Sequence, residues 1–159
     1  MNRLLAIDPA NIRTAYVLLT EDFQIIDKGI LYNEDFILML KEGNYDAIAA
    51  EIIVSYGLRV GESVFSTAEM IGRITQVAKD IGKPISRVRR PDVSRHFKVK
   101  RNQGSPDTQI AKSLRERFAA QPDKNYGKGT KKDPDYFYGF AADVWQAMAV
   151  GVYALDSNK

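Results

Sequence analysis

Three acidic residues stand in stretches of the sequence that are otherwise apolar. Asp8 ends the run LLAID, Glu51 lies within AIAAEIIV, and Asp143 is placed between two alanines and the pair Val-Trp. Each acid alone has an ordinary explanation, since turn caps, sheet edges and first helical turns commonly carry carboxylates. Together, three carboxylates in apolar surroundings would repel one another and raise their pKa values unless a divalent cation lay among them. The pattern therefore predicts a cation site.

The residue types that are missing decide which cation such a site would hold. The chain has no cysteine and a single histidine, His96, which excludes thiolate ligands and argues against a histidine-based zinc site. Only oxygen ligands remain, and these favour Mg²⁺ or Mn²⁺. The lack of cysteine fits a cytoplasmic setting, and neither a membrane span nor a signal peptide is indicated, so we expect no membrane association.

Basic residues gather in two parts of the chain although its net charge is only +3. Residues 83–101 carry eight Lys and Arg against one acid, and residues 124–132 carry four more lysines. A charge run is often only a solvated surface, but two runs with interleaved aromatic residues, in a chain of pI about 9.0, favour nucleic-acid binding. The residues expected to contact DNA are Arg87, Arg89, Arg90, Lys98, Lys100, Arg101, Lys128, Lys131 and Lys132.

The elements that must position these residues follow from hydrophobic periodicity and from cap and turn residues. We expect strands over residues 3–8, 13–19, 25–31, 47–53 and 85–88. Helices are expected over 34–41 with Asn33 as cap, over 63–81, from the cap Ser105 to about 120, and over about 140–155. This order predicts a single α/β domain, with three antiparallel strands first and helices on the faces of a mixed sheet.

Three blocks of the sequence resemble one known family. The opening, AIDPANIRTAYVLL, is similar to that of RuvC-like Holliday junction resolvases of the ribonuclease H-like superfamily, with alanine at two usual glycine positions. The block AAEIIVSYGLRVGESVFSTAEMIGRI resembles their second acidic strand and the helix after it. The block YGKGTKKDPDYFYGFAADVWQAMAVGVYAL resembles the C-terminal part of the variants carried by bacteriophages. In order, these blocks cover nearly the whole chain.

The resemblance implies that residues 1–159 form one RuvC-like nuclease domain, with a ribonuclease H-like five-stranded sheet. Asp8, Glu51 and Asp143 match the family's metal-binding and catalytic acids, which hold two Mg²⁺ or Mn²⁺ ions per active site. The implied activity is symmetric nicking of Holliday junctions and other branched DNA, which leaves 5′-phosphate and 3′-hydroxyl ends. The implied setting is the cytoplasm of a bacterial host.

One position departs from the family pattern. The family places a fourth acid or histidine three residues before the last aspartate, where this chain has Phe140. Because the last helix is expected to begin at about residue 140, that side chain and Asp143 should share one helix face and point toward the same cations. Asp133 or Asp135 could replace the missing ligand from the preceding loop, although an Asp-Pro-Asp loop is more often turn chemistry, or a water molecule could fill the position.

Symmetric cutting implies a two-fold homodimer, for which the helix over 63–81 is the candidate interface. Tyr56 and Phe65 follow Glu51 and are candidates to stack on unpaired bases, or equally to anchor a loop. Three other readings remain. The chain could be a ribonuclease H-like nuclease with another substrate, or a branched-DNA-binding protein that does not cut. An actin-like sugar kinase fits poorly, because 159 residues are too few for two lobes.

Overall fold

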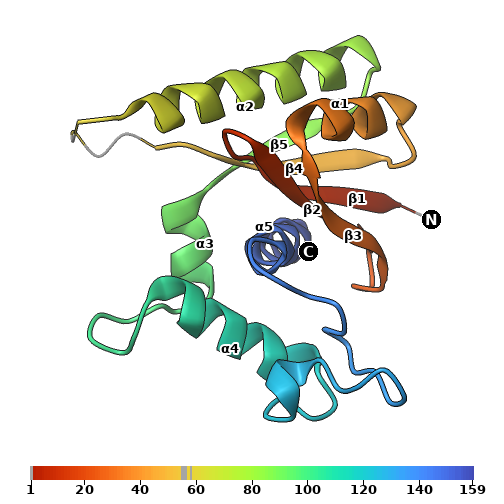
Figure 1. Ribbon diagram of the computed structural model, residues 1–159, viewed down its shortest axis with the longest axis vertical. Coiled ribbons are helices and arrows are strands. Elements are labelled where there is room, and N and C mark those ends of the chain that lie inside the picture. Colours follow the sequence, from red (N-terminus) through yellow and green to blue (C-terminus); the bar gives the residue numbers. More distant parts are fainter. Residues whose placement is uncertain (1, 55–56, 58) are drawn as a thin grey trace.

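A five-stranded mixed sheet with helices on both faces forms the centre of the molecule (Figure 1). The computed structural model describes residues 2–54, 57 and 59–159. The strands are β1 (Arg3–Asp8), β2 (Arg13–Thr20), β3 (Ile25–Tyr32), β4 (Ala47–Ile52) and β5 (Ile85–Arg89), in the sheet order β3-β2-β1-β4-β5. The first three pair antiparallel, whereas β4 runs parallel to β1 and to β5. This confirms the predicted fold class.

The parallel register of β1 and β4 brings two of the three acids together. Ile7 lies opposite Ala50, so the next residues, Asp8 and Glu51, follow at the carboxyl ends of neighbouring strands. Both strands are apolar because they lie inside the sheet with helices on both faces. The ends of such strands are where an α/β sheet commonly places its binding residues.

The helices form one layer on each face of the sheet. They are α1 (Asn33–Glu42), α2 (Glu62–Asp80), α3 (Arg90–His96), α4 (Pro106–Phe118) and α5 (Val144–Ser157), with a short 3₁₀ turn at Asn125–Gly127. One core lies between the sheet and α1 and α2, and the other surrounds α5 with contributions from α3 and α4. Among the described residues, no helix is long and apolar enough to cross a membrane.

The fit of α5 on the sheet depends on a glycine. A Cβ atom built on Gly151 would lie 2.7 Å from Cδ1 of Leu19 and 2.9 Å from Cβ of Ala6. Helix α5 therefore approaches β1 and β2 more closely than any other residue at this position would allow. That approach fixes the start of α5, and with it Asp143, relative to the strand ends.

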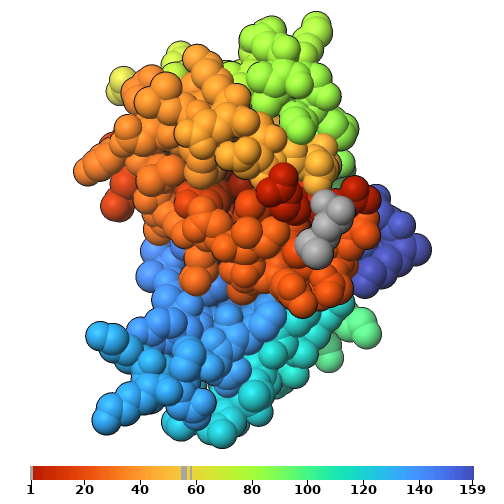
Figure 2. Space-filling view, turned by 90° about the vertical axis from the view of Figure 1, so that its right-hand side faces the viewer, coloured from red at the N-terminus to blue at the C-terminus, as the bar shows by residue number. Residues whose placement is uncertain are grey.

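Asp156, near the C-terminal end of α5, connects this helix to α3 and α4. Arg117 of α4 donates two hydrogen bonds to Asp156 of α5, at 2.6 and 2.9 Å. His96 of α3 lies 2.8 Å from the same carboxylate. The segment between α4 and α5 then runs below the sheet in Figure 1, and with α4 it forms the lower part of the face in Figure 2.

Helix ends and short helices differ most from the sequence-based expectations. Ser105 caps α4 as expected, because its Oγ accepts a hydrogen bond from the Thr108 N–H. Asn33 is not a cap. It is the first helical residue of α1, and its side chain accepts a hydrogen bond from Thr14 and donates one to the Ala10 carbonyl. Helix α3 was not expected at all, since its basic sequence reads as a surface run.

Candidate active site

Asp8 and Glu51 face each other at the carboxyl edge of the sheet. Burial is the largest of the causes that together raise the pKa of Asp8 from 3.8 to about 9, and the charge of Glu51, a hydrogen bond to Glu51 and the charge of Asp143 act in the same direction. Arg90 opposes this shift only weakly, as the last and smallest of the causes. The third acid, Asp143, therefore lies within electrostatic reach of the other two. Two of the three acids of the sequence pattern are thus in contact, and the third lies farther away on the same side of the molecule.

Two residues from other elements hold the Glu51 carboxylate in position. Glu51 is only 8% exposed, and its Oε1 accepts a hydrogen bond of 3.1 Å from the amide of Gln146 in the first turn of α5. Arg90, the first residue of α3, places its guanidinium 3.7 Å from the same oxygen. These contacts provide partners for a carboxylate that burial alone would make costly.

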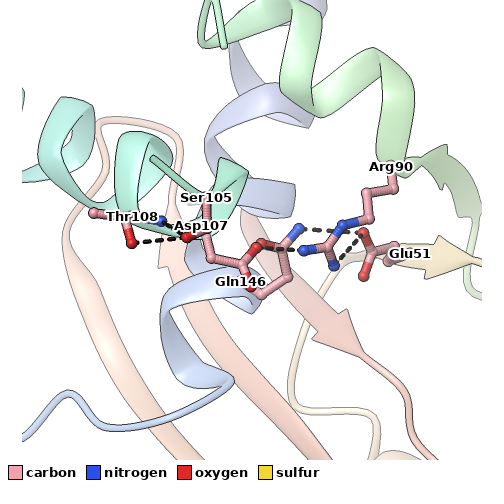
Figure 3. A network of polar contacts seen from close by, with 6 residues as sticks. All are labelled: Glu51, Arg90, Ser105, Asp107, Thr108 and Gln146. Carbon is pink, nitrogen blue, oxygen red and sulfur yellow. Dashed lines mark hydrogen bonds and ion pairs between the residues drawn. The ribbon is translucent and has the colours of Figure 1, made fainter. Parts of the chain in front are cut away.

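Arg90 also joins this site to the start of α4 (Figure 3). Its guanidinium forms an ion pair and hydrogen bond with Asp107. Asp107 belongs to the first turn of α4, which the cap Ser105 orders through the backbone and side chain of Thr108. Arg90 thus bridges two carboxylates, one buried and one exposed, and its charge also acts on Asp8.

Asp143 is the residue that directly precedes α5. It is exposed and lines a small cavity of about 60 Å³ together with Asp107 and Gln146. Its backbone carbonyl accepts the Ala147 N–H at 3.0 Å, which fixes it at the helix start. The cavity is thus bordered by carboxylates from α4 and from the α5 start, beside the Gln146 that contacts Glu51.

The donor set suits a hard divalent cation. Among the described residues, no three Asp, Glu, His or Cys side chains converge closely enough to form a ready ligand set. Asp8 and Glu51, however, are two oxygen donors in contact, and their mutual influence contributes to the raised pKa of Asp8. These residues fit a shared Mg²⁺ or Mn²⁺, with Asp143 adding negative charge nearby.

Comparison with solved structures finds the same architecture in proteins of low sequence identity. The structure of Thermus thermophilus RuvC superposes with a TM-score of 0.66 at 13% identity, covering 98% of this chain and 95% of that one. T. thermophilus RuvC in complex with Holliday junction substrate gives 0.65 at 11% identity, with the same coverage. Yeast mitochondrial Holliday junction resolvase Ydc2 gives 0.57 at 11%, covering 97% and 76%. This chain has the RuvC fold.

The likeness to RuvC is one of structure. No protein-family model matches the sequence, and no curated protein matches it either. The resemblance to RuvC-like proteins is thereby confirmed at the level of the fold. The assignment to a bacteriophage variant stays a prediction, as do the roles of the individual site residues.

Within this RuvC fold, the expectation for Phe140 is wrong. Helix α5 begins at Val144, and Ala142, with a φ of +46°, interrupts any helix across residues 140–143. Phe140 is 1% exposed and packs against Phe137 and Trp145, with ring centroids 5.0 and 5.1 Å away. It therefore does not share a helix face with Asp143. Burial of three aromatic rings decides its position.

The two loop acids considered as replacement ligands are engaged in turns. Asp135 accepts hydrogen bonds from the backbone N–H groups of Ala120, Gln121 and Tyr136, which lower its pKa. The Asp133 backbone closes a turn with Thr130. Asp135 is thus a capping residue whose charge is already matched by three donors.

The expected DNA-binding residues lie in different parts of the molecule. Arg90 belongs to the acid network just described. Arg87 and Arg89 are exposed on the edge strand β5, Lys128 is half-buried, and the others lie exposed in loops. Apart from Arg90, none of these cations forms an ion pair with another described residue. Phe65 is 60% exposed in α2, and Tyr56 lies outside the described residues.

Two residues of the site were not predicted. Asp107 follows Ser-Pro at a helix start, where an acid is expected for the helix dipole alone, so the sequence contains no sign of its ion pair with Arg90. The sequence did contain an indication for Gln146. It is the one polar side chain in the apolar run VWQAMAV, and it is buried, which requires a hydrogen-bond partner.

Proposed function

We propose that this protein is a divalent-metal-dependent endonuclease that resolves Holliday junctions and other branched DNA by nicking two strands symmetrically. The observation that supports the proposal is the contact of Asp8 with Glu51 at the carboxyl edge of a RuvC-fold sheet, with Asp143 within electrostatic reach of Asp8. The fold match to an RuvC that is in complex with Holliday junction substrate supports branched DNA as the substrate.

Each acid has a distinct position from which to act. Asp8 lies at the end of the central strand β1 and is influenced by both Glu51 and Asp143, so it would help to hold each of the ions. Glu51 and Asp143 would each bind mainly one. When bound, the Mg²⁺ or Mn²⁺ ions activate a water molecule and stabilise the leaving 3′-oxygen. Arg90 lies beside Glu51, where it can offset negative charge at the scissile phosphate.

The unpaired cations and the long helix complete the proposal. Arg87 and Arg89 on β5, and the exposed lysines of the loops, form no ion pair with another described residue and would contact the phosphates of the DNA. Symmetric nicking needs two active sites, which a homodimer through α2 would supply. On α2, Phe65 and Ala68 are exposed one turn apart, as an interface requires.

A second candidate is a branched-DNA-binding protein that does not cut. The ion pair of Arg90 with Glu51 favours it, because that pair already neutralises one of the three acids. The absence of a ready three-ligand set among the described residues favours it too. In that case the acids and Arg90 would form a structural network.

One experiment separates these functions. A four-way junction, a flap, an RNA–DNA hybrid and a linear duplex are each incubated with the protein and Mg²⁺ or Mn²⁺, and both binding and cleavage are measured. A resolvase cuts the junction in paired, symmetric positions and leaves the linear duplex intact. Cleavage of the hybrid alone would identify another ribonuclease H-like nuclease. Tight junction binding without cleavage in either metal would establish the binding protein.

A further inference from the structure

A second, larger pocket adjoins the cavity of Asp143. It measures about 330 Å³, within the usual range for small-molecule sites, and lies between α4, the 3₁₀ turn and the start of α5. Asp107, Ala142 and Trp145 line both this pocket and the smaller cavity that contains Asp143. The two spaces therefore share a wall, and a ligand in the larger one would lie close to Asp143.

The wall of this pocket combines aromatic rings with cations. Trp145 is half-buried, stacks on Phe137 at a centroid distance of 4.7 Å, and also lines the pocket. Tyr126 lines it from the 3₁₀ turn, with the Arg115 guanidinium 5.6 Å from the ring centroid. Lys128 adds a second cation. This is the chemistry that binds a flat base and the phosphate attached to it.

Arg115 has capacity for a further hydrogen bond. Its Nε is buried, and no described residue accepts a hydrogen bond from it. A buried donor without an acceptor costs free energy, so the Arg115 side chain is incompletely satisfied where it stands. A small shift of this side chain toward a phosphate oxygen or a base carbonyl in the pocket would relieve that cost.

The backbone of Tyr126 is strained in a way that core packing does not explain. Asn125 and Tyr126 have φ values of +48° and +56°, in the left-handed region that bulky residues rarely adopt. Tyr126 is nevertheless 65% exposed, so it gains little from burial in return. Strain of this kind concentrates at binding sites, and here it holds an aromatic ring at the pocket.

We propose that this pocket, which we call the Tyr126 pocket, binds one unpaired nucleotide of the strand that is to be cut. The base packs against Tyr126 and Trp145, the polar side chains of Asp107 and Thr108 face its edge, and Arg115 and Lys128 contact its phosphate. The proposal rests on the proposed nuclease function for the identity of the strand. Binding in the Tyr126 pocket would thus bring a neighbouring phosphate close to Asp143.

The chain contains a single tryptophan, so Trp145 fluorescence reports on the pocket directly. The protein is titrated with a short single-stranded oligothymidylate and with a duplex of equal charge, in EDTA so that no cleavage occurs. We expect the single strand to quench Trp145 and the duplex to do so far less. Tyr126→Ala should weaken the single-strand affinity about tenfold, in line with the usual effect of removing one stacking ring.

Tyr138→Ala is the matched control, because Tyr138 is also an exposed tyrosine of the same segment but does not line the pocket. It should bind like the wild type. Equal quenching by duplex and single strand, or equal affinity of both variants, would overturn the proposal. Full displacement of the oligonucleotide by inorganic phosphate would reduce the Tyr126 pocket to an anion site and overturn it too. Because no metal is present, these results are independent of whether the protein cleaves junctions.

Discussion

Two carboxyl groups, Asp8 and Asp156, have pKa values that are shifted in opposite directions. Asp156 receives two hydrogen bonds from Arg117 and one from His96, and these contacts lower its pKa. Asp8 meets burial and two further acids, which raise its pKa to about 9. The contacts of Asp156 stabilise the fold without any ligand. The surroundings of Asp8 destabilise its charged form, and such perturbed groups are typical of functional sites.

The largest expected effect comes from replacing Asp8. Asp8→Asn removes the shared charge from the metal site but no contact to phosphate. Cleavage should fall about a thousandfold or more, since metal-based charge stabilisation contributes several kcal/mol. Junction binding, measured by electrophoretic mobility shift in EDTA, should stay equal or become tighter. Cleavage by Asp8→Asn at a near wild-type rate would reduce Asp8 to a turn residue.

The same substitution should stabilise the metal-free protein. Between pH 3.8 and about 9 the folded protein keeps a proton on Asp8 that the unfolded chain has lost, so its stability falls as pH rises through that range. Asparagine cannot ionise and removes this cost. In EDTA at pH 8 we expect Asp8→Asn to raise the thermal midpoint by about 4 °C or more, which corresponds to at least ~1 kcal/mol for a chain of this size.

That gain should vanish near pH 4, where Asp8 is protonated in the folded protein and largely so in the unfolded chain. Thermal unfolding followed by circular dichroism at both pH values checks the sign. A midpoint that drops at pH 8 would mean that the Asp8 carboxylate is well stabilised without metal.

Asp156→Asn should have the opposite profile. The substitution weakens the bidentate contact between Asp156 and Arg117, and the Asp156 side chain is only 16% exposed. We therefore expect the free energy of unfolding to fall by about 1–2 kcal/mol. Since the pKa of Asp156 is lowered, this contribution is present at neutral pH and disappears as the pH falls through the folded-state value. Denaturant titrations at pH 7 and pH 3 measure it, and junction cleavage by the folded variant should be unchanged.

The contrast between paired and unpaired groups extends to the cations. Arg117 is committed to Asp156, whereas Arg87 and Arg89 have no ion-pair partner among the described residues. Replacing both with alanine should flatten the slope of log affinity against log salt for a junction by about 1–2. Lys41→Ala, which removes an exposed cation from α1, is the control. An unchanged slope would place the DNA-binding surface elsewhere.

The sequence predicted what depends on local pattern. One apolar run that ends in Asp8 and another that contains Glu51 were enough to predict strands that carry these acids, and the parallel pairing of β1 with β4 then brings the two acids side by side. The start of α5 was not predictable in this way. Ala142 adopts a left-handed conformation where Phe137, Phe140 and Trp145 pack together, and no local propensity indicates it.

Contacts between distant elements were also beyond the sequence. Arg90 follows a strand in a basic run and Asp107 opens a helix, so each has a sufficient local explanation. Only the folded chain shows that they meet, and that Arg90 also reaches Glu51. Gln146 is the exception, because a buried amide within an apolar helix indicates a polar partner before the partner is known.

The most direct test of the acid site is a calorimetric titration with Mn²⁺ in the absence of DNA, on the wild type, Asp8→Asn and Asp156→Asn. If Asp8, Glu51 and Asp143 form a metal site, the wild type and Asp156→Asn bind Mn²⁺ alike. Asp8→Asn should then bind about tenfold to a hundredfold more weakly or not at all. Equal Mn²⁺ binding by all three proteins, or none by the wild type, would contradict the account.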